Sequence, residues 1–138
     1  MKHKPTHTED TPEFFDGNIK KAAKDNTFFR RVVYTGPHCQ LAVMNIPVGE
    51  DIGEEVHPNT DQILVIIDGH GEAILNGQVQ PAKQHSVIFV TAGTRHNINN
   101  IGHKPLKLAT VYAPPEHAGG VVHKTKEEAM QEHVQLTP

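Results

Sequence analysis

Turn-forming residues divide the middle of this sequence into short segments, and their spacing is the strongest limit on the fold. From Phe28 to Tyr112, such residues recur about every 8 to 12 positions between stretches rich in β-branched and aromatic residues. One of these turns, Asn76-Gly77, is a strong hairpin signal. The longest aliphatic run, Ile63 to Ile67, is too short for a buried helix or a membrane span. We therefore predict an all-β protein of roughly eight or nine short strands, arranged as a sandwich or barrel.

Two short helices are expected to flank the strands. Asn18 is placed to cap a helix that runs to Asp25, and Thr125 with Glu128 forms a capping box for a second helix that ends near Val134. The 138 residues suffice for one domain with its own core. We predict a tail and short helix at 1–27, the β-barrel at 28–113, and a C-terminal extension with a short helix at 114–138.

Composition and charge exclude several classes of protein. The formal net charge of −3 argues against nucleic-acid binding, which usually requires a clearly basic surface. From Val32 to Ala82 there is no Lys or Arg but there are seven acidic residues, an arrangement that attracts cations. Cys39 is the single cysteine, so no intrachain disulfide can form. The first residues lack the apolar segment of a signal peptide, and we expect a cytoplasmic protein that does not bind membranes.

Four side chains, distant along the chain, form a candidate metal site. Glu55 and His57 stand two positions apart, so both point to the same side of an extended strand. A turn after His57 can bring Gln62 back beside it, and His96 follows a turn at Gly93. Two imidazoles, a carboxylate and an amide oxygen are a mixed nitrogen and oxygen set that suits a divalent transition metal such as Mn, Fe, Ni, Co or Zn.

Each of these residues also has a simpler interpretation. Either histidine alone would more often be a structural side chain bonded to a backbone carbonyl. Glu55 can instead serve as a catalytic base that lies beside the metal without binding it. Gln62 is the weakest of the four donors, because its amide oxygen carries no charge. For His85, His103, His117 and His123 we expect positions on the surface or packed against the tail.

The spacing of these residues resembles that of the cupins, a family of small jelly-roll barrels that hold a divalent metal. The first cupin motif has a glycine, five residues, His, one residue, His, four residues, Glu, six residues and a glycine. The corresponding positions here are Gly49, Glu55, His57, Gln62 and Gly69. The spacing is intact, but Glu55 stands at the first His position and Gln62 at the Glu position.

The second cupin motif also matches in spacing but not in every residue. It has a glycine, five residues, Pro, one residue, Gly, two residues, His, three residues and Asn. These positions hold His85, Thr91, Gly93, His96 and Asn100, so the first glycine and the proline are replaced. The chain is most similar to small bacterial cupins with a Pro-Pro-Glu-His tail, which are often described as sugar-phosphate isomerase-like. The tail is present at Pro114 to His117.

The resemblance implies a jelly-roll barrel, the double-stranded β-helix of the cupins, with the metal held by Glu55, His57, Gln62 and His96. Three functions remain open. The first function is that of a metalloenzyme, isomerase-like or a dioxygenase, that acts on a small polar molecule such as a sugar derivative, with Glu55, if only partly bound to the metal, moving a proton. Alternatively, the protein binds or senses a small ligand without turnover, or it is a structural protein without a metal. Pairing of two barrels is usual in cupins, and we expect a homodimer.

Overall fold

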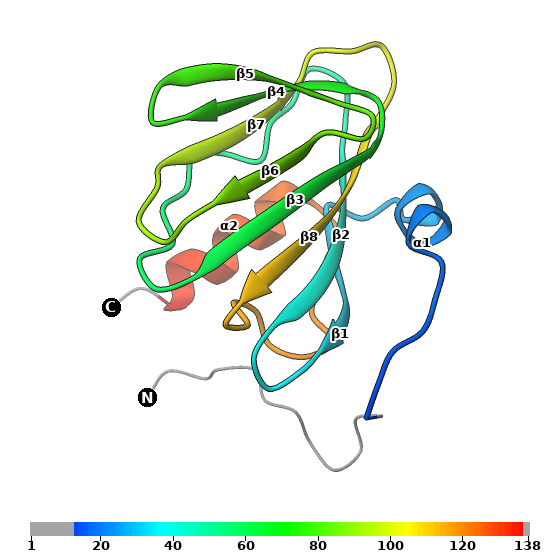
Figure 1. The fold of residues 1–138 in the computed structure, drawn as a ribbon, viewed down its shortest axis with the longest axis vertical. Coiled ribbons are helices and arrows are strands. Elements are labelled where there is room, and N and C mark those ends of the chain that lie inside the picture. The colour runs from blue at the N-terminus through cyan, green and yellow to red at the C-terminus, as the bar shows by residue number, and fades with distance from the viewer. Residues whose placement is uncertain (1–12, 137–138) are drawn as a thin grey trace.

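The computed structural model describes residues 13–136, which form two antiparallel sheets packed face to face (Figure 1). The larger sheet has six strands in the order β6-β3-β8-β2-β1-β9, and the smaller sheet has the order β5-β4-β7. The predicted all-β jelly roll with two short helices is confirmed, while the part of the tail at 1–12 lies outside the described residues. The elements in chain order are α1 (Ile19–Asp25), β1 (Arg30–Thr35), β2 (Gln40–Ile46), β3 (Asp61–Asp68), β4 (His70–Leu75), β5 (Gln78–Lys83), β6 (Val87–Val90), β7 (His96–Asn100), β8 (Leu106–Ala113), β9 (Val122–His123) and α2 (Lys126–Leu136).

Local sequence signals explain several element boundaries. Asn76 and Gly77 have φ values of 49° and 82°, the left-handed pair that a tight turn between β4 and β5 requires. The side chain of Asn18 accepts a hydrogen bond from the backbone N–H of Lys21 at 2.9 Å and so caps α1. At α2, the backbone N–H of Glu128 donates to the Thr125 hydroxyl at 3.2 Å, as the capping box predicts.

The core lies between the two sheets and follows the alternation of the strands. On β3, Gln62, Leu64 and Ile66 point inward and are buried, while the residues between them are half-buried on the outer face. Leu64 and Ile66 pack with Ile98 of the small sheet, and burial of each such side chain contributes about 1.5–3 kcal/mol. The same alternation brings the polar Gln62 inside, so one end of the interior is apolar and the other is polar.

The predicted strand around Glu55 and His57 is wrong in part. This segment is extended but belongs to no named strand. It makes two isolated bridges to β7, at Asp51 with Asn99 and at Glu55 with His96, and in the second the two backbones exchange hydrogen bonds of 2.9 and 3.0 Å. Gly53, which has a φ of 102°, and Pro58, which lacks an N–H, prevent longer pairing. The second bridge nevertheless fixes Glu55 beside His96. The short strand β9 was not predicted, because two residues carry no periodic signal.

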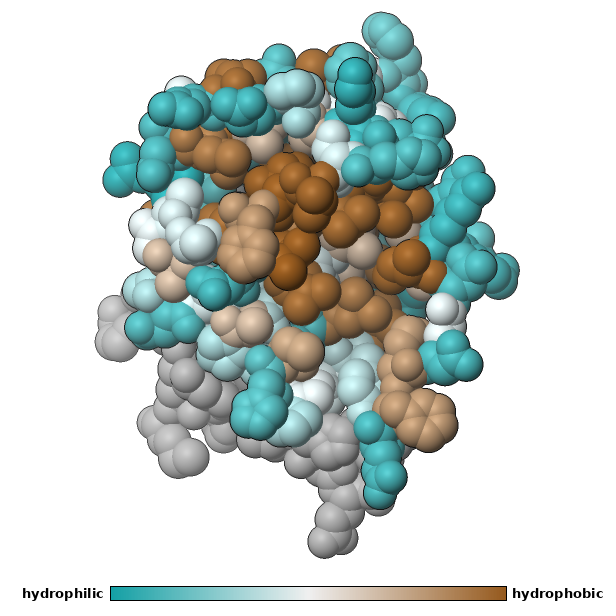
Figure 2. Space-filling view, in the orientation of Figure 1, coloured by the Kyte–Doolittle hydropathy of each residue, from teal (hydrophilic) through white to brown (hydrophobic). Residues whose placement is uncertain are grey.

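The outer face of the large sheet is only partly covered. Helix α1 packs on Val43 and Ala109 through Ala23. Beyond the helix, apolar side chains gather at the surface over β3 and β6 (Figure 2). Val87 and Phe89 are 66% and 60% exposed, and they pair in register with Val65 and Ile63, respectively. We call these four residues the β3–β6 patch.

Within residues 13–136, neither helix combines the length and the apolar character needed to cross a membrane.

Candidate metal centre

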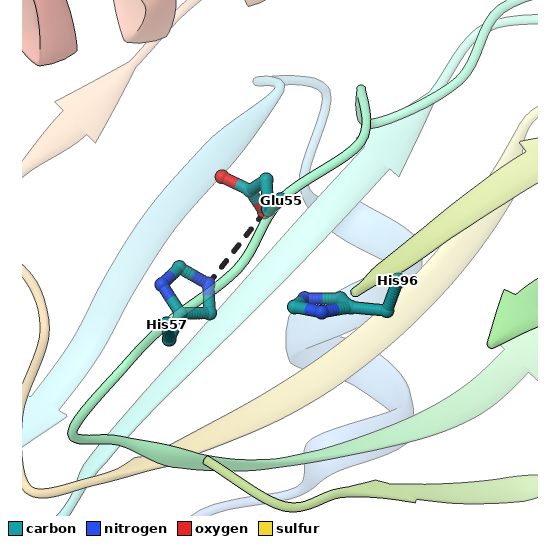
Figure 3. Close-up of side chains that lie close together, drawn as sticks. All are labelled: Glu55, His57 and His96. Atoms are coloured by element: carbon teal, nitrogen blue, oxygen red, sulfur yellow. Dashed lines mark ion pairs between the residues drawn. The ribbon is translucent and has the colours of Figure 1, made fainter. Parts of the chain in front are cut away.

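Glu55, His57 and His96 converge inside the barrel although they come from two separate segments (Figure 3). One potential ligand atom from each residue lies within 4.8 Å of those of the other two. The bridge between Glu55 and His96 holds the extended segment against β7, and the alternation along that segment turns His57 to the same side as Glu55. The convergence that the sequence predicted is therefore present.

Gln62 completes the group from β3. Its amide nitrogen donates to the Thr110 hydroxyl at 3.0 Å, which turns the amide oxygen toward His96 Nε2 at 3.1 Å. The other ring nitrogen of His96, Nδ1, lies 2.9 Å from the carbonyl oxygen of Thr94. Both nitrogens of one imidazole thus face oxygen acceptors, and a neutral ring has only one N–H to donate. A hydrogen or a cation must lie between Nε2 and the Gln62 oxygen.

His57 is held by carboxylates on both sides. Its Nε2 lies 3.7 Å from a Glu55 oxygen, and its Nδ1 lies 3.5 Å from a Glu116 oxygen, while the side chain as a whole is 11% exposed. Thr60 donates its hydroxyl to the other Glu116 oxygen at 3.0 Å. Nε2 of His57 is buried and makes no hydrogen bond within the described part of the chain. That nitrogen faces Glu55 at ion-pair distance and would bind a metal after losing its proton.

The charges of the cluster are strongly coupled. Burial raises the pKa of Glu55, but the neighbouring His57 and Arg30 outweigh it, so that the pKa lies below its ordinary value and the carboxylate is ionised. Burial lowers the pKa of His57, but the flanking Glu116 and Glu55 outweigh it and raise the pKa to about 9. Without a metal, His57 is therefore protonated at neutral pH and forms part of a charged pair with Glu55.

The polar interior continues beyond the cluster through a row of rings. The ring of Tyr112 lies 6.1 Å from that of His57 and 5.0 Å from that of His117, and His123 follows at 5.7 Å. For His117 and His123 we expected a surface position or packing against the tail. A surface position is wrong for His123, which is 5% exposed on β9 at the edge of the large sheet, and His117 is half-buried with its ring against that of Tyr112. His85 and His103 are exposed, as predicted.

Arg30 is an interior residue that the sequence did not single out. It is 4% exposed, and its guanidinium donates to His123 Nδ1 at 3.1 Å, while His123 Nε2 contacts Glu132 of α2. Arg30 lies in the Phe-Phe-Arg-Arg segment, and period-2 alternation from buried Val32 would have placed it on the inner face of β1. Arg95, in contrast, is exposed beside Glu54.

One replaced and one matching position of the second motif keep the turns that the motif requires. His85 has a φ of 75° at the position where the motif has glycine, a conformation that is uncommon for a residue with a Cβ. Asn100 donates to the carbonyl oxygens of Ile46 and Lys104 at 2.9 and 3.0 Å and thereby holds the turn after β7. The motif's spacing thus reflects the turns that position His96.

Comparison with known proteins identifies relatives of this chain. The family model described as "Cupin domain" matches residues 42–112. The uncharacterized protein YrkC of Bacillus subtilis is 43% identical over 129 residues, which cover 86% of this chain and 67% of that protein. The crystal structure of BH2720 from Bacillus halodurans superposes with a TM-score of 0.86 at 41% identity, over 91% of this chain and 99% of that one. A predicted oxalate decarboxylase from Thermotoga maritima superposes with a TM-score of 0.52 at 31% identity, over 54% and 64% of the two chains.

Proposed function

This chain belongs to the cupin family, and on that premise we propose that it binds one divalent transition metal through Glu55, His57, Gln62 and His96. The metal in turn binds a small polar molecule inside the barrel. The observation that carries this proposal is the pair of imidazole nitrogens turned into the cluster. Nε2 of His57 has no hydrogen-bond partner among the described residues, and Nε2 of His96 faces an amide oxygen.

The donor chemistry fits such an ion. Imidazole nitrogens and carboxylate or amide oxygens bind Mn, Fe, Co, Ni and Zn, and the bound cation supplies Lewis acidity to a ligand oxygen. The contacts of the chain would orient each donor. Thr110 holds the Gln62 amide, the carbonyl of Thr94 holds His96, and Glu116 holds His57. Partners of this kind fix the orientation of metal ligands and raise their affinity.

Two kinds of chemistry are open to this centre. An isomerase-like reaction on a sugar derivative needs a base beside the polarised oxygen, and the ionised Glu55, if it is only partly bound to the metal, is the carboxylate that would move that proton. A dioxygenase is the second candidate, because two histidines and one carboxylate are the donors of many non-haem iron oxygenases. Oxygen uptake after anaerobic loading with Fe²⁺ separates the two, and a ligand that stabilises the protein without turnover would instead assign a binding or sensing role.

Calorimetric titration of tag-free protein with Ni²⁺, Zn²⁺ and Mn²⁺ tests the metal site. We expect one metal per chain, and loss of at least about 100-fold in affinity in His57→Ala and in His96→Ala, since each removes a ligand. His103→Ala, which removes an exposed imidazole, is the matched control and should bind as the wild type does. Equal metal binding by all four proteins would place the metal elsewhere.

We also propose that two copies pair through the β3–β6 patch. Strand β6 ends the six-stranded sheet, and its outer face exposes Val87 and Phe89 without a charged residue between them. A second copy related by a two-fold axis presents the same apolar surface, so the contact is self-complementary. Light scattering should report a dimer that Val87→Lys dissociates. Val79→Lys, at a 57% exposed valine on β5, should leave the dimer intact. A monomeric wild type would refute this pairing.

A further inference from the structure

The guanidinium of Arg30 is buried in the barrel and makes no direct ion pair with a described carboxylate, although the charges of Glu55 and Glu132 act on it from farther away. Arg30 is 4% exposed, and among the residues the structure describes no carboxylate lies within ion-pair distance of it. Its polar contacts are with Nδ1 of His123, at 3.1 Å, and with the side chain of Tyr112, and its Nε–H has no hydrogen-bond partner among those residues. A buried charge in this state is costly, and most proteins pair it.

A second polar atom near Arg30 is also without a partner. Nε2 of His117 is buried and makes no hydrogen bond to any described residue. The ring of His117 packs edge-on against Tyr112 at 5.0 Å, and the ring of Tyr112 packs in the same way against His57. The positive charge of Arg30 acts to lower the pKa of Tyr112, of His117 and of Glu55. Arg30 therefore lies on the same side of the interior as the candidate metal centre.

The carboxylates around this interior have other partners. The side chains of Glu55, Glu116 and Glu132 are 33%, 31% and 35% exposed, and each forms an ion pair with a histidine. The motif's Glu position holds the neutral Gln62, so it adds no further carboxylate. The buried guanidinium therefore keeps an N–H donor, Nε–H, that no described residue accepts.

We propose that Arg30 and His117 form an anion subsite beside the metal centre, which binds the carboxylate of a small organic acid through Arg30 Nε–H and His117 Nε2–H. This inference rests on the proposed function, because another oxygen of the same acid would reach the metal. Two N–H donors match the two oxygens of a carboxylate, whereas a phosphate offers three oxygens and more charge than this pair can satisfy. The subsite therefore selects hydroxy- or oxo-carboxylates over neutral sugars and over phosphate esters.

The test compares small acids with their neutral counterparts. Metal-loaded protein is titrated calorimetrically with glycolate, lactate and 3-hydroxypropionate, with the matched diols ethylene glycol, propane-1,2-diol and propane-1,3-diol, and with inorganic phosphate. We expect at least one acid to bind at least about tenfold more tightly than its diol and than phosphate. Arg30→Gln should weaken binding of that acid by roughly 10- to 100-fold, as expected for loss of a charge-assisted hydrogen bond, while binding of metal and diol is retained.

Two further variants keep the test decisive. His117→Phe retains the packing against Tyr112 but removes the Nε2 donor, so it should weaken the acid and not the metal even if Arg30→Gln does not fold. Arg31→Gln, on the opposite face of β1, is the matched control and should behave as the wild type does. Unchanged acid binding in His117→Phe, a preference for the diol, or tighter binding of phosphate would each overturn the subsite. A chain that binds no metal but still binds acids through Arg30 would refute the metal proposal alone.

Discussion

The amide oxygen of Gln62 lies 3.1 Å from Nε2 of His96, although Nδ1 of the same ring already faces the Thr94 carbonyl at 2.9 Å. Thr110 accepts the amide N–H and fixes which way the amide points. Either Nε2–H of His96 donates to the Gln62 oxygen, or both atoms offer lone pairs that a bound cation would accept. This contact makes Gln62, at the position where the cupin motif has Glu, the residue whose replacement is most informative.

Gln62→Glu is expected to bind the metal more tightly than the wild type does. The carboxylate restores a full charge at the donor position, and the Thr110 hydroxyl can donate to it in place of accepting. We expect affinity to rise by about tenfold or more, measured by competition with a metal indicator. Gln62→Leu, which keeps the size but removes the oxygen, should bind more weakly than the wild type. Equal affinities in all three proteins would mean that Gln62 does not touch the metal.

Metal affinity should rise with pH. His57 must lose its proton to bind a metal, and its pKa of about 9 means that this proton is present at neutral pH. The apparent affinity is therefore expected to increase by about tenfold for each pH unit from 6.5 to near 9 and then level off. Calorimetry in buffers of different ionisation enthalpy should show about one proton released per metal at pH 7. A flat profile over this range would contradict the charged pair of His57 with its carboxylates.

The metal-free protein should lose stability over the same interval. Because the pKa of His57 is raised in the folded chain, its contribution is fully present below pH 6.5, the ordinary value, and is lost as the pH rises through about 9. A pKa difference of one between the folded and unfolded chain corresponds to roughly 1.4 kcal/mol in the free energy of unfolding. Urea unfolding in the presence of a chelator at pH 6.5 and pH 9 measures the change, and a more stable protein at pH 9 would refute the assignment.

Glu116→Gln tests the residue that holds His57 from the side away from Glu55. The Glu116 oxygen lies 3.5 Å from His57 Nδ1, and replacing partners of this kind typically costs about 10- to 100-fold in metal affinity. The same variant should flatten the pH dependence of stability described above, since it removes one of the two carboxylates beside His57. Glu127→Gln, at an exposed residue of α2, should change neither property.

Much of the barrel could be predicted from local patterns. The Asn76-Gly77 turn, the alternation in Asp61–Asp68 and the caps at Asn18 and Thr125 are each determined by a few neighbouring residues, and all occur in the structure. The convergence of Glu55, His57 and His96 could be predicted because a two-residue spacing and a turn at Gly93 determine it. The spacing of the two cupin motifs along the chain was needed only to identify the family.

The interior positions of His117 and His123 could not be predicted, because they depend on how the C-terminal segment packs against the large sheet. His117 and His123 carry no periodic signal. His123 is buried because β9 pairs with β1, which places it opposite Arg30, whereas the backbone of His117 is held by the side chain of Gln40. The segment with Glu55 was predicted as a strand, but isolated bridges to β7 replace a continuous ladder, since Gly53 and Pro58 interrupt the pairing.

Elemental analysis of protein purified without an affinity tag tests the central claim most directly. We predict about one equivalent of a single transition metal per chain in the wild type and in His103→Ala, and none in His57→Ala/His96→Ala at equal fold content by circular dichroism. A wild-type protein that contains no stoichiometric metal and binds none when titrated, or a double variant that retains the full equivalent, would contradict the account.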